Sequence, residues 1–150
     1  MVENEETISV AESVTAGNIQ HALSLAPNAT QFFQGGISAY NIGQKSRHLQ
    51  INPIHALSCN CVSQQVANDM AINVCKLFLS DWGISITGYA ELIPDITELY
   101  AFYAIAYKEK IINSGHIKTQ APDKKTAQKY YKEKVLRELY NLIITSKQSR

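Results

Sequence analysis

A short turn near the N-terminus constrains the fold more than any other part of the sequence. Segment 11–17 has the sequence AESVTAG, which brings a carboxylate, two hydroxyls and a glycine together. The residues before it, among them Ile8 and Val10, are typical of a buried strand, and apolar residues recur after it at helical spacing. Proteins of the α/β class bind ligands at such strand-to-helix turns. The backbone N–H groups and hydroxyls of this turn therefore predict an anion or oxyanion site.

The same turn also has a purely structural interpretation. Ser13 and Thr15 are residue types that cap helices, and either one at this position would satisfy the free N–H groups of the helix that follows. The turn alone leaves both interpretations open.

The hydrophobic pattern predicts alternating strands and helices. Expected strands are 7–11, 33–40, 83–87, 99–107 and 110–118, and expected helices are 16–25, 62–80 and 123–145, with a short turn or helix after residue 40. The last two strands indicate a hairpin, although the turn near Lys108 lacks the glycine or asparagine typical of hairpins. We expect an α/β fold, a single layered domain with a mixed β-sheet flanked by helices. It would span residues 7–145, between tails at 1–6 and 146–150.

Length and charge limit the classes of protein to which the chain can belong. At 150 residues, 45% of them hydrophobic, it can bury one sizeable core. A net charge of +1 gives no electrostatic case for binding nucleic acid. No apolar run is long enough to cross a membrane, and residues 1–6 are polar and acidic, unlike a signal peptide. We therefore expect a cytoplasmic protein that binds neither nucleic acid nor membrane.

Cysteine and histidine do not form a recognisable metal site. The three cysteines are an odd number, which favours reduced thiols, and Cys75 falls on the apolar side of a predicted helix. Cys59 and Cys61 lack a second ligand pair at zinc spacing, and the four histidines are scattered. A catalytic cysteine would need a histidine partner that the sequence does not identify. We expect no metal and no cofactor.

Further segments follow the turn in a defined order. Segment 34–41 (QGGISAYN) is followed by Lys45, segment 61–63 (CVS) opens a long predicted helix, and segment 84–88 has the sequence ISITG. In this order and spacing they resemble the C-terminal domain of the competence/damage-inducible protein CinA, from about Thr7 to Leu142. That family has an A-E-S-x-T-G-G turn, a strand ending in G-x-x-x-Y, a lysine five residues later, a V-S helix start and a T-G-x-A-G-P loop.

The resemblance implies an amidohydrolase, nicotinamide mononucleotide deamidase, which cuts the carboxamide of the nicotinamide ring and releases ammonia. It implies that Ser13 supplies a hydroxyl near the ring and that Tyr40 and Lys45 activate the nucleophile. It further implies substrate contacts from the turn and from the end of strand 83–87, through Thr15, Gly17, Thr87 and Gly88. Structural interpretations stay open, because Tyr40 could be a half-buried strand residue, Lys45 a surface lysine and Thr87 a hydroxyl that closes a turn.

Three departures from the family pattern affect the implied chemistry. Thr30 stands where the family carries its proposed nucleophilic serine, and its extra methyl group restricts its rotamers. The loop after Gly88 has no further glycine, and it adds three carboxylates, which would repel a phosphate. A gap-free alignment places Ala127 at the position of the family's arginine. Lys124 or Lys125 could replace that arginine as a point charge.

These observations leave three hypotheses. The chain is an amidohydrolase acting on nicotinamide mononucleotide or a related amide, with Thr30 or Ser13 as nucleophile and with weak or absent activity. Alternatively, it is a non-catalytic module that binds a small molecule or forms oligomers, or an enzyme of another class that uses the same pocket. A homo-oligomer is expected because the aromatic residues are numerous for one small core: Tyr100, Phe102, Tyr103, Tyr130, Tyr131 and Tyr140.

Overall fold

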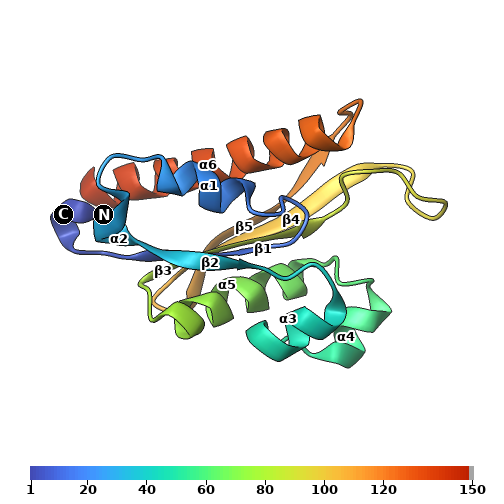
Figure 1. Cartoon of the computed structure of the whole chain (residues 1–150), viewed down its shortest axis with the longest axis horizontal. Helices are drawn as coiled ribbons and strands as arrows, with labels where there is room; N and C mark the ends of the chain where they lie inside the picture. Colours follow the sequence, from blue (N-terminus) through green and yellow to red (C-terminus); the bar gives the residue numbers. More distant parts are fainter. Residues whose placement is uncertain (149–150) are drawn as a thin grey trace.

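A mixed β-sheet forms the centre of the fold. The computed structural model describes residues 1–148, and within them the strands lie in the order β2-β1-β3-β4-β5 (Figure 1). The strands are β1 (Ile8–Glu12), β2 (Phe33–Ser38), β3 (Trp82–Gly88), β4 (Leu99–Tyr107) and β5 (Lys110–Thr119). β1 pairs in parallel with β2 and β3, whereas β4 pairs antiparallel with β3 and β5. The predicted α/β fold with a mixed sheet is therefore confirmed.

The β4–β5 connection forms the expected hairpin without the expected turn residues. Lys108 and Glu109 both adopt left-handed backbone conformations, with φ of 48° and 62°. This is the geometry that a two-residue hairpin turn needs and that asparagine and glycine adopt most easily. The antiparallel pairing of β4 with β5 extends from Leu99–Thr119 to Tyr107–Lys110, next to the turn, and holds these two residues in this conformation.

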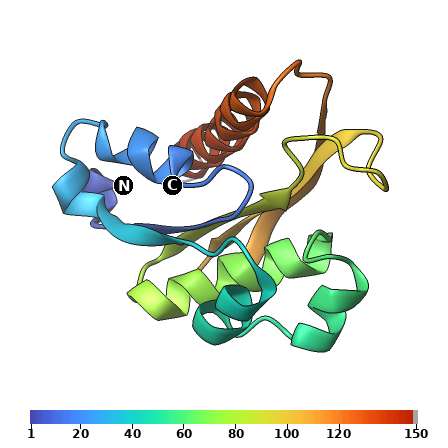
Figure 2. The same ribbon diagram turned by 45° about the vertical axis from the view of Figure 1, so that its right-hand side comes forward.

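Helices cover both faces of the sheet (Figures 1 and 2). α1 (Asn18–Ser24) and α6 (Lys124–Gln148) lie on one face, and α3 (Ile42–Leu49), α4 (Pro53–Ser58) and α5 (Gln64–Phe78) lie on the other. Short helices also precede β1 and β2, namely η1 (Val2–Asn4) and α2 (Ala29–Phe32). Of the predicted C-terminal tail, residues 149–150 lie outside the described residues, and α6 continues to Gln148. No helix within residues 1–148 combines the length and apolarity that a bilayer crossing would need.

The two faces of the sheet differ in side-chain size. Large aliphatic residues of β1 and β3, such as Val10 and Ile84, pack with α6 residues, Tyr131 among them. Towards α5 the same strands present small residues, and the hydroxyl groups of Ser9 and Ser85 donate hydrogen bonds to carbonyl groups of that helix. A Cβ atom on Gly83 would overlap the carbonyl oxygen of Ala71 in α5. Small side chains therefore allow α5 to approach the sheet closely.

Three parallel strands end at the same edge of the sheet. The chain leaves β1 at Glu12, β2 at Ser38 and β3 at Gly88, and each exit continues into a loop at that edge. Open α/β sheets bind ligands at the carboxyl ends of their strands. The fold thus brings together segments that are distant in the sequence, including the turn at 13–17.

Candidate functional site

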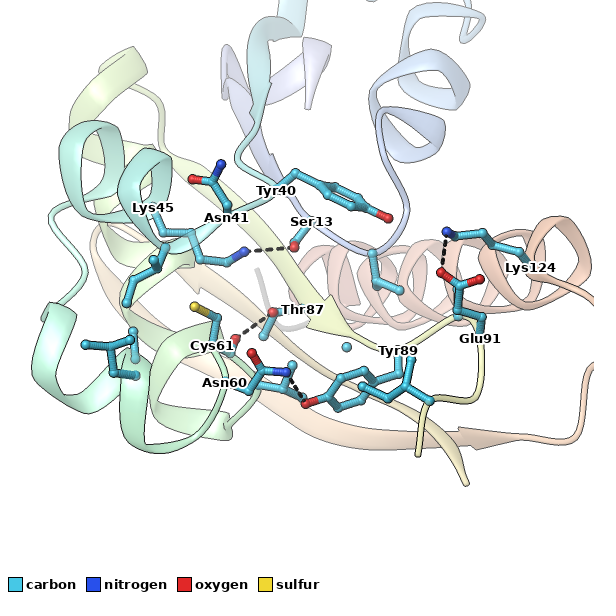
Figure 3. A pocket seen from close by; sticks show the side chains of 18 residues that line it. Ser13, Tyr40, Asn41, Lys45, Asn60, Cys61, Thr87, Tyr89, Glu91 and Lys124 are labelled. Atoms are coloured by element: carbon cyan, nitrogen blue, oxygen red, sulfur yellow. Dashed lines mark hydrogen bonds and ion pairs between the residues drawn. The ribbon is translucent and has the colours of Figure 1, made fainter. Parts of the chain in front are cut away.

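A cavity of about 390 Å³ opens at this edge of the sheet. Segments distant in the sequence contribute polar groups to its lining, among them Ser13 after β1, Tyr40 after β2, Lys45 in α3, Thr87 at the end of β3 and Lys124 at the start of α6. Figure 3 shows these side chains around the cavity. Ser13, Tyr40, Lys45 and Thr87, all singled out in the sequence, thus line one cavity.

Lys45 and Ser13 form a buried pair at the bottom of the cavity. Nζ of Lys45 lies 2.8 Å from Oγ of Ser13 and 2.8 Å from the carbonyl oxygen of Ala39. Only 1% of Lys45 and 7% of Ser13 is exposed. Burial lowers the pKa of Lys45 from its ordinary value of 10.5, and the nearby Cys61 thiol opposes the shift. No carboxylate within residues 1–148 forms an ion pair with Lys45, so burial has the largest effect on its pKa and favours the neutral amine.

Helix α3 gives Lys45 its position. The side chain of Asn41 caps this helix by accepting a hydrogen bond from the backbone N–H of Gln44, at 3.0 Å. The cap starts α3 directly after the loop that contains Ala39 and Tyr40. Lys45 then faces inwards, on the same side of the helix as the buried Leu49. The structure therefore excludes the interpretation of Lys45 as a surface lysine.

Glu12, the carboxylate of the AESVTAG turn to which the sequence analysis gave no role, holds the turn that carries Ser13. Its buried carboxylate accepts hydrogen bonds from the hydroxyl of Thr15 at 2.6 Å and from the backbone N–H of Ile19 at 2.7 Å. The backbone N–H and the side-chain amide of Gln20 add two more, at 3.1 and 2.9 Å. Glu12 thus supplies the negative charge at the N-terminus of α1. A carboxylate at the end of a predicted buried strand is the one sequence signal that could have indicated this role.

The turn separates structural residues from cavity residues. Thr15 is fully buried, donates to Glu12 and does not line the cavity. Gly17, with φ of 97°, is the N-cap of α1 and also lies outside the lining. The structure therefore does not bring these two predicted substrate contacts to the cavity. Ser13 does not cap α1, whose N-cap is Gly17, and its hydroxyl accepts a hydrogen bond from Lys45.

Thr87 and Cys61 connect the end of β3 to the loop before α5. The hydroxyl of Thr87 donates to the carbonyl oxygen of Cys61 at 2.7 Å, and both residues line the cavity together with Gly88. Burial raises the pKa of the Cys61 thiol. The thiol is therefore neutral near pH 7 and a weak nucleophile. Thr87 orients the loop as well as facing the cavity.

Two tyrosines flank the mouth of the cavity. Tyr40 is 58% exposed, so it is a rim residue and not the half-buried strand aromatic that the sequence allowed. Tyr89 lies on the other side, where its hydroxyl accepts a hydrogen bond from Asn60 at 3.0 Å (Figure 3). Flat aromatic surfaces on both sides of the opening suit a planar ring as ligand.

An ion pair completes the rim. Nζ of Lys124 donates to Oε1 of Glu91 at 2.8 Å, and this hydrogen bond raises the pKa of Lys124. Lys125, one residue later, does not line the cavity. Ala127, which the gap-free alignment pairs with the family's arginine, is fully buried in the core and does not line the cavity. The only lysine of α6 that faces the cavity is therefore Lys124, within the described residues.

Thr30 is not part of the cavity. It lies exposed in α2, before the first residue of β2, whereas the cavity begins beyond the last residue of that strand. The six residues of β2, at about 3.3 Å each, separate the two positions. This geometry places Thr30 away from the cavity that Ser13 lines, contrary to the prediction of Thr30 as its nucleophile. Within residues 1–148 no cluster of histidine, cysteine or carboxylate side chains could hold a metal ion.

Comparison with known sequences identifies related proteins. The family model of the CinA C-terminal domain matches residues 1–140. A CinA-like protein of Prochlorococcus marinus is 45% identical over 86 residues, which are 57% of this chain and 20% of that protein. A CinA-like protein of Gloeothece citriformis is 42% identical over 85 residues, again 57% of this chain and 20% of that protein. The matched region thus covers about a fifth of these curated relatives.

Solved structures share the fold. A CinA superfamily protein from Enterobacter cloacae superimposes with a TM-score of 0.85 at 24% identity, over 92% of this chain and 82% of that one. The competence damage-inducible protein A of Klebsiella pneumoniae gives a TM-score of 0.88 at 21% identity, over 95% of this chain and 89% of that one. At such identities the likeness concerns the fold.

Proposed function

Because the chain belongs to the CinA C-terminal domain family, we propose that it is an amide hydrolase in which Ser13 is the nucleophile and Lys45 the general base. The resemblance to nicotinamide mononucleotide deamidases suggests a carboxamide on a pyridine ring as the group that is cut. The observation that carries the proposal is the buried contact of 2.8 Å between Nζ of Lys45 and Oγ of Ser13. An unactivated serine is a poor nucleophile, and an adjacent base corrects this.

The proposed reaction has two halves. In the first, the neutral amine of Lys45 accepts the proton of the Ser13 hydroxyl while Oγ attacks the carboxamide carbon. The C–N bond then breaks, Lys45 returns the proton to the leaving nitrogen, and ammonia departs from an acyl-serine ester. In the second half, Lys45 deprotonates a water that attacks the ester. The ester C–O bond breaks, Oγ of Ser13 recovers the proton, and the carboxylic acid is released.

A backbone group beside Ser13 can stabilise the oxyanion. Val14 lines the cavity, and its N–H has no acceptor within residues 1–148. The residue after the nucleophile supplies such a donor in other serine hydrolases. The ordered Glu12 contacts fix this turn, so the donor needs no rearrangement during the reaction. Tyr40 and Tyr89 would hold the ring at the mouth.

The experiment that tests the proposal is ammonia release with the native protein and the Ser13→Ala variant. We expect release from nicotinamide riboside or nicotinamide mononucleotide by the native protein, and loss of about a thousandfold or more in the variant, because the acyl ester cannot form. Equal rates in the two proteins would contradict the proposal. Ligand binding without any ammonia from the native protein would favour the alternative hypothesis, a non-catalytic binding module.

The rate should rise with pH. Lys45 acts only as the neutral amine, and burial lowers its pKa from 10.5, so the active fraction grows as the pH increases towards the lowered pKa. We expect kcat/KM to increase and then level off at a pH below 10.5, measured between about pH 6 and 10. A rate that falls over this range would contradict the role of Lys45 as base.

We further propose that the protein binds a small molecule, associates with itself and lies in the cytoplasm. Self-association was expected from the number of aromatic residues, but two of them, Tyr103 and Tyr131, are buried in the core. Tyr140 on α6 stays exposed and offers aromatic surface to a second copy.

A further inference from the structure

We propose that Glu91 selects substrates without a phosphate group, so that the chain hydrolyses a cationic or neutral aromatic amide in preference to its phosphorylated form. This inference rests on the proposed function and concerns the substrate class of the same cavity. It assigns Glu91 the role of a specificity-determining residue that occupies Lys124 and itself repels a phosphate.

No basic group in the cavity is free to bind a phosphate. Lys45 and Lys124 are the only basic side chains of the lining, all of which falls within the described residues. Lys45 lies buried beneath Ser13, and its pKa is lowered, so it serves the reaction centre. Lys124 is engaged with Glu91 at 2.8 Å. A phosphate would have to displace Glu91 from Lys124 and then remain beside a carboxylate.

The loop around Glu91 offers no alternative phosphate site. After Gly88 the segment 89–98 contains no glycine, and glycines are what allow backbone N–H groups to surround a phosphate closely. Among the three carboxylates of the loop, Glu91 alone lines the cavity. Glu98 instead forms an ion pair with Lys118 at 2.9 Å, outside the lining. Repulsion of a phosphate at the mouth therefore comes from Glu91.

The rest of the mouth favours a flat and positively charged ring. Tyr40 and Tyr89 present aromatic faces there, and such faces attract cations. Glu91 adds a negative charge on the same rim. A pyridinium amide joined to an uncharged sugar has the matching chemistry. The same molecule with a phosphate on the sugar adds a negative group that meets the Glu91 carboxylate.

The test compares nicotinamide riboside with nicotinamide mononucleotide, which differ by the phosphate. For each we would measure kcat/KM from ammonia release with the native protein, Glu91→Gln and Glu98→Gln. Glu98→Gln is the matched control, because it removes a lysine-paired carboxylate of the same loop outside the cavity. We expect the native protein to prefer the riboside. Glu91→Gln should shift the ratio towards the mononucleotide by about fivefold, since an exposed pair is screened by solvent, and Glu98→Gln should leave it unchanged.

A binding measurement separates failure of this inference from failure of the proposed function. Calorimetric Kd values of both compounds for the Ser13→Ala protein, with and without Glu91→Gln, report selectivity even where no ammonia is released. The same shift in the Kd ratio would support the role of Glu91. The inference would be overturned if the native protein preferred the mononucleotide or bound neither compound. It would also be overturned if Glu91→Gln left the ratio of the two Kd values unchanged.

Discussion

Replacing Lys45 with methionine is expected to lower the rate of amide hydrolysis by about a thousandfold or more while the protein remains folded. Methionine has a similar length and suits a site that is 1% exposed, but it has no amine to accept the Ser13 proton. The substrate-binding groups at the mouth are untouched, so kcat should fall and ligand Kd should change little. Ammonia release measures the rate, calorimetry measures the ligand Kd, and a thermal unfolding curve shows whether the variant is folded.

Lys125→Met is the matched control for this variant. Lys125 is exposed at the start of α6 and does not line the cavity, so its replacement should leave kcat unchanged. The residual activity of Lys45→Met should also lose the rise of rate with pH that Lys45 confers on the native protein. A Lys45→Met protein that keeps more than about a tenth of the native rate would show that another group activates Ser13.

The fold followed from the hydrophobic pattern because short apolar runs mark the buried strands β1 and β3, and apolar residues at helical spacing mark α5. Predicted strands 83–87 and 99–107 differ from β3 and β4 by one residue or none. Strand β2 ends at Ser38 and not at residue 40, because the chain turns there into the loop that presents Tyr40 to the cavity. Local pattern does not encode where a strand loses its pairing partner.

Cavity residues at the ends of core strands could be predicted from the sequence. Cavity residues on a helix could not, because their place depends on the direction in which each side chain points. Ser13 and Thr87 close buried strands, so parallel pairing brings them to one edge. Ala127 and Lys124 lie one helical turn apart, yet the first packs in the core and the second reaches the cavity. Spacing in the sequence cannot decide between such neighbours, because it leaves the rotation of the helix about its axis undetermined.

Glu12 illustrates a second limit of the sequence. Its neighbours in the turn, Ser13 and Thr15, are the usual helix-capping types, whereas the structure gives the contacts at the start of α1 to a glutamate several residues upstream. The turn curls back so that the end of β1 faces the N-terminus of the helix. Such an arrangement arises from tertiary packing, and its one local signal is a carboxylate at the end of a predicted buried strand.

Replacing Glu12 with alanine is therefore expected to lower the free energy of unfolding by about 3 kcal/mol or more. The change removes a buried carboxylate that accepts four hydrogen bonds and leaves the donors of Thr15, Ile19 and Gln20 without their acceptor. Buried donors that lose their partner carry the full cost of desolvation. Urea-induced unfolding measures the difference.

Glu98→Ala is the control for this substitution, because Glu98 forms an exposed ion pair and its loss should cost less than about 1 kcal/mol.

Under native conditions Glu12→Ala should also reduce kcat, since the turn that Glu12 fixes carries Ser13 and the N–H of Val14. A displacement of about 1 Å at a reacting group can lower the rate a hundredfold. Thr15→Val removes one of the four contacts and should fall between Glu12→Ala and the native protein in both measurements. A Glu12→Ala protein as stable as Glu98→Ala would show that the turn is held by packing alone, and the preorganised geometry proposed for Ser13 would then need another origin.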